Sequence, residues 1–133
     1  MARCINGHSF DANKRGYINL LPAGNRMIGD SPEMLDARSA FLEAGHFSAI
    51  RDALVRSASA AGEAAGVPPR ILDAGCGTGY YLAGVLNACG ALARALALDI
   101  SVPAVMRSVR VAGLTAPPSM AAYVNDSSVS DTT

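Results

Sequence analysis

Two short apolar runs, each closed by an aspartate, stand out in the hydrophobic pattern of the chain. The first covers residues 71–72, ends at Asp73 and is followed by three glycines at alternate positions. The second covers residues 95–98 and ends at Asp99. Short apolar runs bounded by turn residues are typical of buried strands. The pattern therefore predicts two strands, with a glycine-rich turn and a helix between them.

Helical spacing of apolar residues predicts two helices before the first strand and one after the second. The earliest begins at Ser31, which offers a capping hydroxyl ahead of a proline, and ends at Gly45. The next has an apolar face over residues 47–54 and is expected to fade into the small-residue stretch 57–66. The helix after the second strand is predicted over 101–112 and stops at a glycine.

The two ends of the chain carry weaker patterns. Residues 17–21 predict a short strand, and the glycine- and proline-containing stretch 22–30 is typical of a linker. After the last helix, breaker and polar residues dominate, and residues 120–124 form at most one short strand. The predicted organisation is an N-terminal element with its linker (1–29), the main α/β domain (30–112) and a disordered tail (113–133).

Composition and charge narrow the class of protein. The chain has 133 residues, half of them hydrophobic, with 11 basic and 11 acidic side chains. It has no apolar run long enough to span a bilayer and no cysteine spacing typical of a disulfide framework, so a cytoplasmic location without a membrane partner is expected. The first 26 residues are nevertheless basic, with Arg3, Lys14, Arg15 and Arg26 against Asp11. These basic residues either bind phosphate groups or form a solvated surface.

The glycine turn is a candidate ligand site. Glycine permits backbone angles and a close approach that a Cβ would block, and N–H groups at the start of a helix can face a ligand. A dinucleotide-binding turn has the pattern G-x-G-x-x-G, whereas this chain has D-x-G-x-G-x-G from Asp73, which points away from NAD. The alternative is a turn used only for tight packing. Asp99 likewise either accepts ribose hydroxyls at the carboxyl ends of the strands or lies at a helix start beside Ser101.

Cys4 and His8 are separated by a glycine-containing turn, a spacing that can place a thiol and an imidazole on one metal ion. A structural zinc site needs four protein ligands, and the other two usually come from a C-x-x-C pair. The chain has no such pair, and Cys76 and Cys89 belong to the glycine turn and its helix. Cys4 and His8 are therefore predicted to be half of a zinc site.

Three motifs, in this order, resemble the guanine-N1 methyltransferases of large-subunit ribosomal RNA, a class I S-adenosylmethionine-dependent family that includes macrolide-resistance enzymes. They are C-x-N-G-H-x-F-D with G-Y-I-N-L-L in residues 4–21, M-x-x-A-R-x-x-F-L-x-x-G-H-F in residues 34–47, and D-A-G-C-G-T-G-Y-Y from Asp73. The resemblance implies an α/β fold of the partial Rossmann-like class I methyltransferase type, with N-terminal helices and an incomplete zinc-knuckle segment.

The resemblance also implies ligands and partners. In the family, an aromatic residue after the G-H pair and the glycine loop contact the cofactor, and the wider superfamily adds further positions. The residues implied to bind S-adenosylmethionine are Phe47, Asp73, Gly75, Gly77, Thr78, Gly79 and Asp99. Cys4 and His8 match the last two of four zinc ligands in the family's knuckle. A ribosomal RNA hairpin is the implied partner.

The implied function is transfer of a methyl group from S-adenosylmethionine to N1 of a guanine in large-subunit ribosomal RNA. The family's later strands and base-holding loop have no counterpart beyond Pro103, and two zinc ligands would precede Met1. A chain truncated at both ends and poorly active is therefore expected, with no catalytic base that can be named. The alternatives are a non-catalytic fragment that retains weak nucleoside or RNA binding, and a decayed product without a stable fold.

Overall fold

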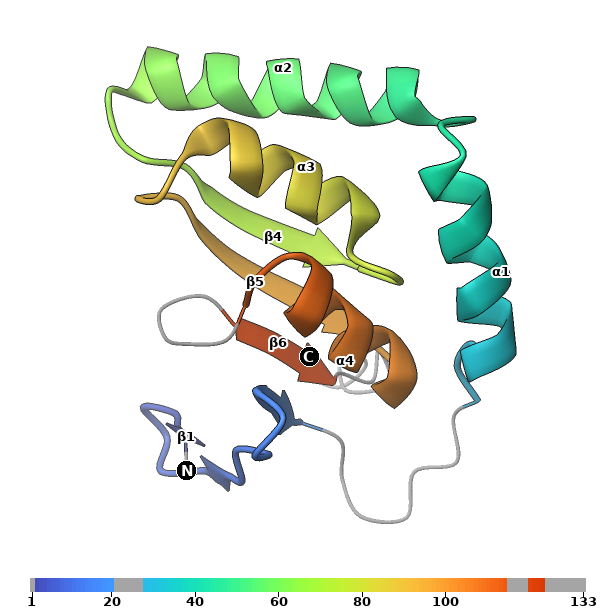
Figure 1. Ribbon diagram of the computed structural model, residues 1–133. Coiled ribbons are helices and arrows are strands. Elements are labelled where there is room, and N and C mark those ends of the chain that lie inside the picture. The colour runs from blue at the N-terminus through green and yellow to red at the C-terminus, as the bar shows by residue number, and fades with distance from the viewer. Residues whose placement is uncertain (1, 21–27, 115–119, 124–133) are drawn as a thin grey trace, which may run out of the picture.

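A sheet of four parallel strands organises the chain in the computed structural model, which describes residues 2–20, 28–114 and, by their backbone only, 120–123 (Figure 1). The strands, in spatial order, are β3 (Tyr17–Asn19), β6 (Met120–Tyr123), β5 (Arg94–Asp99) and β4 (Arg70–Ala74). The register pairs Arg70 with Arg94, Leu96 with Met120 and Tyr17 with Ala121. A separate antiparallel hairpin joins β1 (Ala2–Arg3) to β2 (Ser9–Phe10).

The helices lie in layers against this sheet. They are α1 (Pro32–Glu43), α2 (Ser48–Ala65), α3 (Tyr80–Cys89) and α4 (Val102–Val111). Helices α3 and α4 contact the strands directly, α2 runs along α3, and α1 lies beside α4 (Figure 1). The connections β4–α3–β5 and β5–α4–β6 are the crossovers that parallel neighbouring strands require.

The core lies between one face of the sheet and the helices α3 and α4. Its buried residues are Cys76, Leu82, Ala95, Ala97, Val105, Val109 and Leu114. Successive side chains of a strand point to opposite faces. Leu72 and Leu96 lie on the other face, where they are 64% and 37% exposed. The described residues therefore form an α/β unit with a parallel sheet, as predicted, whose core lies on one side of the sheet.

Most predicted elements are confirmed with small shifts at their ends. The Ser31 hydroxyl accepts a hydrogen bond from the Met34 N–H at 3.3 Å, and the Ser101 hydroxyl accepts one from the Ala104 N–H at 3.2 Å. These are the caps that the sequence indicates for α1 and α4. The glycine turn leads into α3, and the two aspartate-terminated runs form β4 and β5.

The predicted fading of α2 is wrong. The helix continues through the small-residue stretch to Ala65, and Gly66 ends it with a φ of +65°. Among its later residues, Val55, Ala58, Ser59 and Gly62 are partly covered. Their spacing places them on one side of the helix. Packing of this side, in a helix that contacts α3 closely, outweighs the low helix propensity of serine and glycine.

The two ends of the chain are more closely joined to the domain than the sequence indicates. Strand β3, in the predicted N-terminal element, belongs to the main sheet, and Ile18 is buried. Within the predicted disordered tail, Leu114 is buried and β6 lies between β5 and β3. The boundary predicted at residue 113 therefore falls too early. The remainder of the tail (115–119 and 124–133) and most of the linker (21–27) lie outside the described residues.

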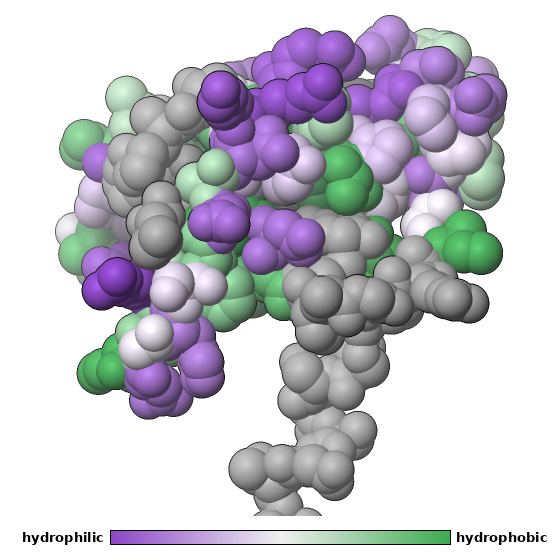
Figure 2. All heavy atoms as spheres, turned by 90° about the horizontal axis from the view of Figure 1, so that it is seen from below, coloured by the Kyte–Doolittle hydropathy of each residue, from purple (hydrophilic) through white to green (hydrophobic). Residues whose placement is uncertain are grey.

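The surface shows no membrane element in the part of the chain that the structure describes, where no helix is both long and apolar enough to cross a bilayer. On the face shown in Figure 2, hydrophobic residues form several separate groups among hydrophilic ones. The largest exposed apolar side chains are likewise spread over the termini, the helices and the strands.

Candidate functional site

The glycine turn between β4 and α3 is held against the carboxyl end of β5. The N–H groups of Gly75 and Cys76 both donate to the carbonyl oxygen of Leu98, at 2.8 and 2.9 Å. Gly75, Gly77 and Gly79 have φ angles of +79°, +52° and +80°. Side chains other than glycine rarely adopt such angles. The three glycines are therefore required by the path of the backbone itself.

Gly79 and Gly77 serve different purposes within this turn. A Cβ on Gly79 would lie 2.8 Å from the Cα of Ser108, so this glycine allows α3 to start against α4. A Cβ on Gly77 would meet only the Arg38 guanidinium, at 3.8 Å. Both purposes considered from the sequence, packing and ligand approach, thus occur in one turn: Gly79 is a packing residue and Gly77 borders open space.

Asp99 joins the turn to the start of α4. One carboxylate oxygen accepts a hydrogen bond from the Gly77 N–H at 2.9 Å, and the other accepts one from the Ser101 N–H at 2.8 Å. The position beside Ser101 at a helix start is therefore confirmed. Each carboxylate oxygen can accept more than one hydrogen bond, so the predicted contact with a ribose is compatible with this geometry.

Two titratable groups below the turn are shifted by burial. Burial raises the pKa of the half-buried Asp73 carboxyl, and the neighbouring Asp99 charge raises it further. Burial raises the pKa of the Cys76 thiol to about 12. Cys76 is therefore a neutral thiol at physiological pH, which suits neither a nucleophile nor a zinc ligand.

A pocket of about 460 Å³ opens between the glycine turn, α1 and the start of α2. Its lining residues are Arg38, Phe41, Leu42, Phe47, Gly75, Cys76, Gly77, Thr78 and Tyr81. Four of the seven predicted cofactor residues, Phe47, Gly75, Gly77 and Thr78, are thus brought together. Asp73, Gly79 and Asp99 do not line the pocket. Gly79 supports it by packing on α4 and Asp99 by the hydrogen bond to Gly77, whereas Asp73 lines a separate pocket.

Aromatic side chains border the pocket on the side of the two N-terminal helices. Phe41 and Phe47 make an edge-to-face contact with ring centroids 5.3 Å apart, and Phe41 stacks on His46 at 4.5 Å. Phe41 and Phe47 remain 47% and 42% exposed. Exposed aromatic rings next to the glycine turn and a cationic side chain form a surface suited to a ligand with both apolar and polar parts.

Sequence reasoning missed Arg38, Phe41 and Leu42 as pocket residues. The signal was present, because all three belong to the motif M-x-x-A-R-x-x-F-L. Residues spaced three and four positions apart lie on one face of a helix, so this motif places them together on α1. That the same face meets the glycine turn depends on how α1 docks, which the motif does not show.

A series of contacts fixes α1 at the pocket. Arg38 forms an ion pair with Asp30, whose carbonyl oxygen accepts a hydrogen bond from the Ser101 hydroxyl at 2.8 Å. Gly29 allows this crossing, because a Cβ there would lie 2.6 Å from the Cβ of Ser101. Since Ser101 also donates its N–H to Asp99, the glycine turn, α4 and the segment before α1 form one connected unit.

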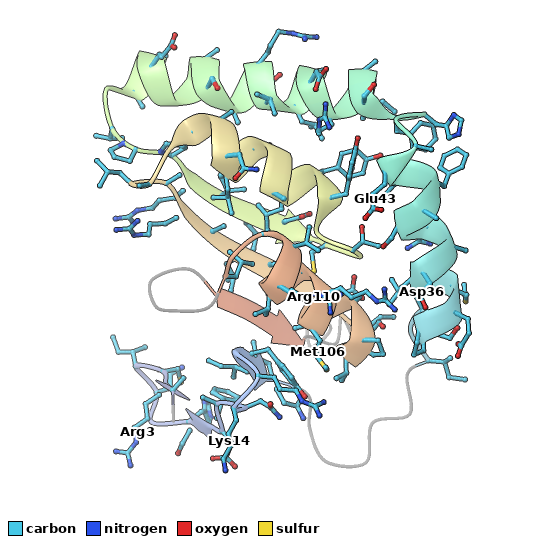
Figure 3. All side chains as sticks on the ribbon, in the orientation of Figure 1. Arg3, Lys14, Asp36, Glu43, Met106 and Arg110 are labelled. Atoms are coloured by element: carbon cyan, nitrogen blue, oxygen red, sulfur yellow. The ribbon has the colours of Figure 1, made fainter. Side chains whose placement is uncertain are left out.

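Helix α4 holds α1 at a second point. Arg107 contacts the Asp36 carboxylate at 2.6 Å and donates to the Pro32 carbonyl oxygen at 3.0 Å. In Figure 3, Asp36 lies on α1 opposite the stretch of α4 that carries Met106 and Arg110. Contacts with α4, which lie outside the pocket, therefore orient the face of α1 that lines the pocket.

Cys4 and His8 lie together, as predicted. The Cys4 N–H donates to the His8 carbonyl oxygen at 3.0 Å, and the Cys4 Sγ lies 3.2 Å from the His8 Nδ1. Among the described residues, no group of three possible ligands surrounds a common point. A structural zinc site takes four protein ligands, so the described residues fit zinc only as half a site.

Comparison with known proteins shows what the chain is similar to. Residues 1–27 match the zinc-ribbon family described as "RlmA, N-terminal". The chain is 43% identical, over 81% of its length, to a protein of Micromonospora griseorubida assigned as a 23S rRNA (guanine-N(1)-)-methyltransferase. It is 42% identical, also over 81% of its length, to the 23S rRNA (guanine(748)-N(1))-methyltransferase of Streptomyces fradiae.

These alignments cover 40% and 38% of the two relatives, so the chain spans about two fifths of their length. The matched family model ends near the predicted linker, and the longer alignments cover most of the chain. The similarity predicted from the three motifs is therefore confirmed: the chain resembles the 23S rRNA guanine-N1 methyltransferases, and its N-terminal segment resembles the zinc ribbon of the RlmA family.

Proposed function

We propose that the pocket beside the glycine turn binds S-adenosylmethionine, and that the 133-residue chain is a poorly active form of a methyltransferase that acts on guanine N1 in 23S ribosomal RNA. One observation carries the proposal: the pocket brings Phe47 together with Gly77 and Thr78, which lie far from it in the sequence, and the family resemblance implies all three as cofactor contacts. The proposal includes a Rossmann-like class I methyltransferase fold for the main domain.

The pocket fits the parts of this cofactor. A ligand has room beside Gly77, since a Cβ at this position would meet no atom closer than 3.8 Å. Phe41 and Phe47 offer ring faces and edges to the adenosyl group or the sulfonium, because aromatic rings attract cations. Asp99 holds the turn by its hydrogen bond to Gly77 and adds an acceptor for the ribose.

The chemical contribution of the chain is alignment. S-adenosylmethionine, when bound, supplies a methyl group activated by the positively charged sulfur. The residues of this chain hold the cofactor and exclude water on one side through Phe41, Phe47 and Leu42. Alignment of donor and acceptor can account for about 7–11 kcal/mol of barrier lowering in favourable cases. The half zinc site takes no part in this step.

A second candidate function is binding of nucleosides or RNA without catalysis. Guanine N1 must lose its proton during methylation, and the described residues that line the pocket include no carboxylate and no histidine. The Cys76 thiol in the pocket wall is a poor base because it stays protonated. This observation favours binding without turnover for the 133-residue chain, with a ribosomal RNA hairpin as partner and the cytoplasm as its location.

Cofactor binding is tested by calorimetry with S-adenosylmethionine on the wild-type chain and on Gly77→Val. A valine would place three carbons in the space beside the Arg38 guanidinium and would strain the backbone, so we expect binding to be lost. Gly66→Val is the matched control, since Gly66 also has a positive φ, of +65°, but lies at the end of α2. Equal affinity in wild type and Gly77→Val would refute the assignment of the pocket.

Catalysis is tested separately, by transfer of a labelled methyl group to 23S ribosomal RNA hairpins. The Streptomyces fradiae relative serves as positive control under the same conditions. We expect the 133-residue chain to bind the cofactor and to transfer no detectable methyl group. Turnover comparable to that of the positive control would show that a base is present outside the described pocket lining, and would decide for catalysis.

A further inference from the structure

Arg38 is the one charged residue among the described residues that line the pocket. Its guanidinium faces the middle of the glycine turn, where a Cβ on Gly77 would lie 3.8 Å from the Arg38 Nη1. The side chain is 47% exposed. It extends from α1, whereas the turn itself follows β4. A cation and the open space beside Gly77 therefore lie next to each other.

The guanidinium is held in place by groups outside the pocket. Asp30 pairs with the Arg38 Nη1, and the Asp30 backbone is fixed by the hydrogen bond from the Ser101 hydroxyl. A guanidinium carries five N–H donors in a rigid plane, so the ion pair with Asp30 leaves donors for another acceptor. The ion pair thus orients Arg38 without using up its capacity to bind an anion.

We propose that Arg38 receives the carboxylate of the methionine moiety of S-adenosylmethionine and so determines which end of the cofactor lies at the glycine turn. This inference rests on the proposed function of the pocket. Guanidinium–carboxylate pairs are among the strongest hydrogen-bonded ion pairs and are frequently bidentate. The carboxylate is the only acid group of the cofactor, so Arg38 distinguishes the amino-acid end from the adenosyl end by charge.

The experiment removes the guanidinium from the protein and the carboxylate from the ligand, separately and together. The affinities of wild type and Arg38→Gln are measured by calorimetry for S-adenosylmethionine and for decarboxylated S-adenosylmethionine, which keeps the amine and the adenosyl group. For S-adenosylmethionine we expect the substitution to weaken binding about tenfold to a hundredfold, the size of a hydrogen-bonded ion pair. For the decarboxylated ligand we expect no loss.

Arg56→Gln is the matched control, because Arg56 is an exposed arginine on α2 that does not line the pocket. Arg38→Lys tests geometry at constant charge and should lie between the wild type and Arg38→Gln. An equal loss of affinity for both ligands in Arg38→Gln would overturn the inference, but the proposal that the pocket binds the cofactor would stand. If neither ligand binds to the wild type, the proposed function is overturned, and the inference with it.

If Arg38→Gln does not fold, as judged by its circular dichroism, the wild type still decides the question. Salt screens interactions between exposed charges. Affinity for S-adenosylmethionine should then fall with rising ionic strength more steeply than affinity for the decarboxylated ligand. An equal or smaller dependence for S-adenosylmethionine would overturn the inference.

Discussion

A side chain at Gly79 would have no room, because its Cβ would lie 2.8 Å from the Cα of Ser108 and 2.9 Å from the Ser108 hydroxyl oxygen. The first of these neighbours is backbone of α4, which cannot move without shifting the helix. Gly79 is itself buried. Gly79, the residue at the start of α3, is therefore also a contact residue between α3 and α4.

We expect Gly79→Ala to destabilise the fold by roughly 2–5 kcal/mol, the sum of left-handed backbone strain and overpacking. Gly66→Ala is its control, because Gly66 has a similar backbone conformation but open space around a Cβ. The control should lose only about 1–2 kcal/mol. Urea unfolding of both variants measures the difference, and equal losses would contradict the packing role of Gly79.

Asp73 should make stability fall as the pH rises. Its pKa is raised in the folded protein above the ordinary value of 3.8, so the folded state holds the proton more tightly than the unfolded chain. Stability is therefore lost as the pH rises from 3.8 through the folded pKa. We expect Asp73→Asn to raise the melting temperature at neutral pH, with the gain disappearing as the pH falls towards 3.8. A lower melting temperature of Asp73→Asn at neutral pH would show that its carboxylate makes a stabilising contact.

The residues of the glycine turn and of its support were predictable where local geometry demands a residue type. Gly75, Gly77 and Gly79 follow from the positive φ angles of the turn, and the aspartate at the end of β5 follows from the strand pattern. Arg38 was not predictable in this way. Its place at the pocket depends on Asp30, Ser101 and the docking of α1, which are contacts between distant parts of the chain.

At the scale of elements, α1 supplies one wall of the pocket while its anchor lies on α4. Arg107 is mostly buried, with 18% of its side chain exposed, and it contacts both Asp36 and the Pro32 carbonyl oxygen. Arg107 of α4 thus holds the N-terminal part of α1 from outside the pocket. Loss of this anchor should let the helix move relative to the glycine turn.

We expect Arg107→Gln to lower the free energy of unfolding by about 1 kcal/mol, since Asp36 is largely exposed and its pairing is screened by solvent. The affinity for S-adenosylmethionine should fall as well, because Arg38, Phe41 and Leu42 are carried by α1. Arg110→Gln, an exposed position on the same helix, should change neither quantity appreciably. Thermal melting and calorimetry measure the two effects; unchanged affinity in Arg107→Gln would show that α1 is positioned by other contacts.

Sequence patterns predicted the helices better than they predicted which strands belong to the sheet. Caps and apolar spacing located α1 and α4, because these signals are local. These local signals did not predict the length of α2, because its second half is stabilised by packing of small residues in a helix that lies along α3. Strand β6 has no strong pattern of its own, and its central place results from pairing with β5 and β3.

At the scale of the whole molecule, the N-terminal segment lacks two of the four ligands that a structural zinc ion takes, within the described residues. We expect purified protein to hold much less than one zinc per chain, and Cys4→Ser to remove what is bound. Elemental analysis combined with the molar mass in solution tests this. One tightly held zinc per monomeric chain would contradict the half-site interpretation.

The pairing of β3 with β6 also sets the order in which the protein can be completed during synthesis. Tyr17 leaves the ribosome early, but its sheet partner Ala121 is added only after β4 and β5 have been made. Until then β3 has no strand beside it in the sheet, although α3 can already pack on β4 and β5. β3 can therefore join the parallel sheet only when β6 emerges from the ribosome.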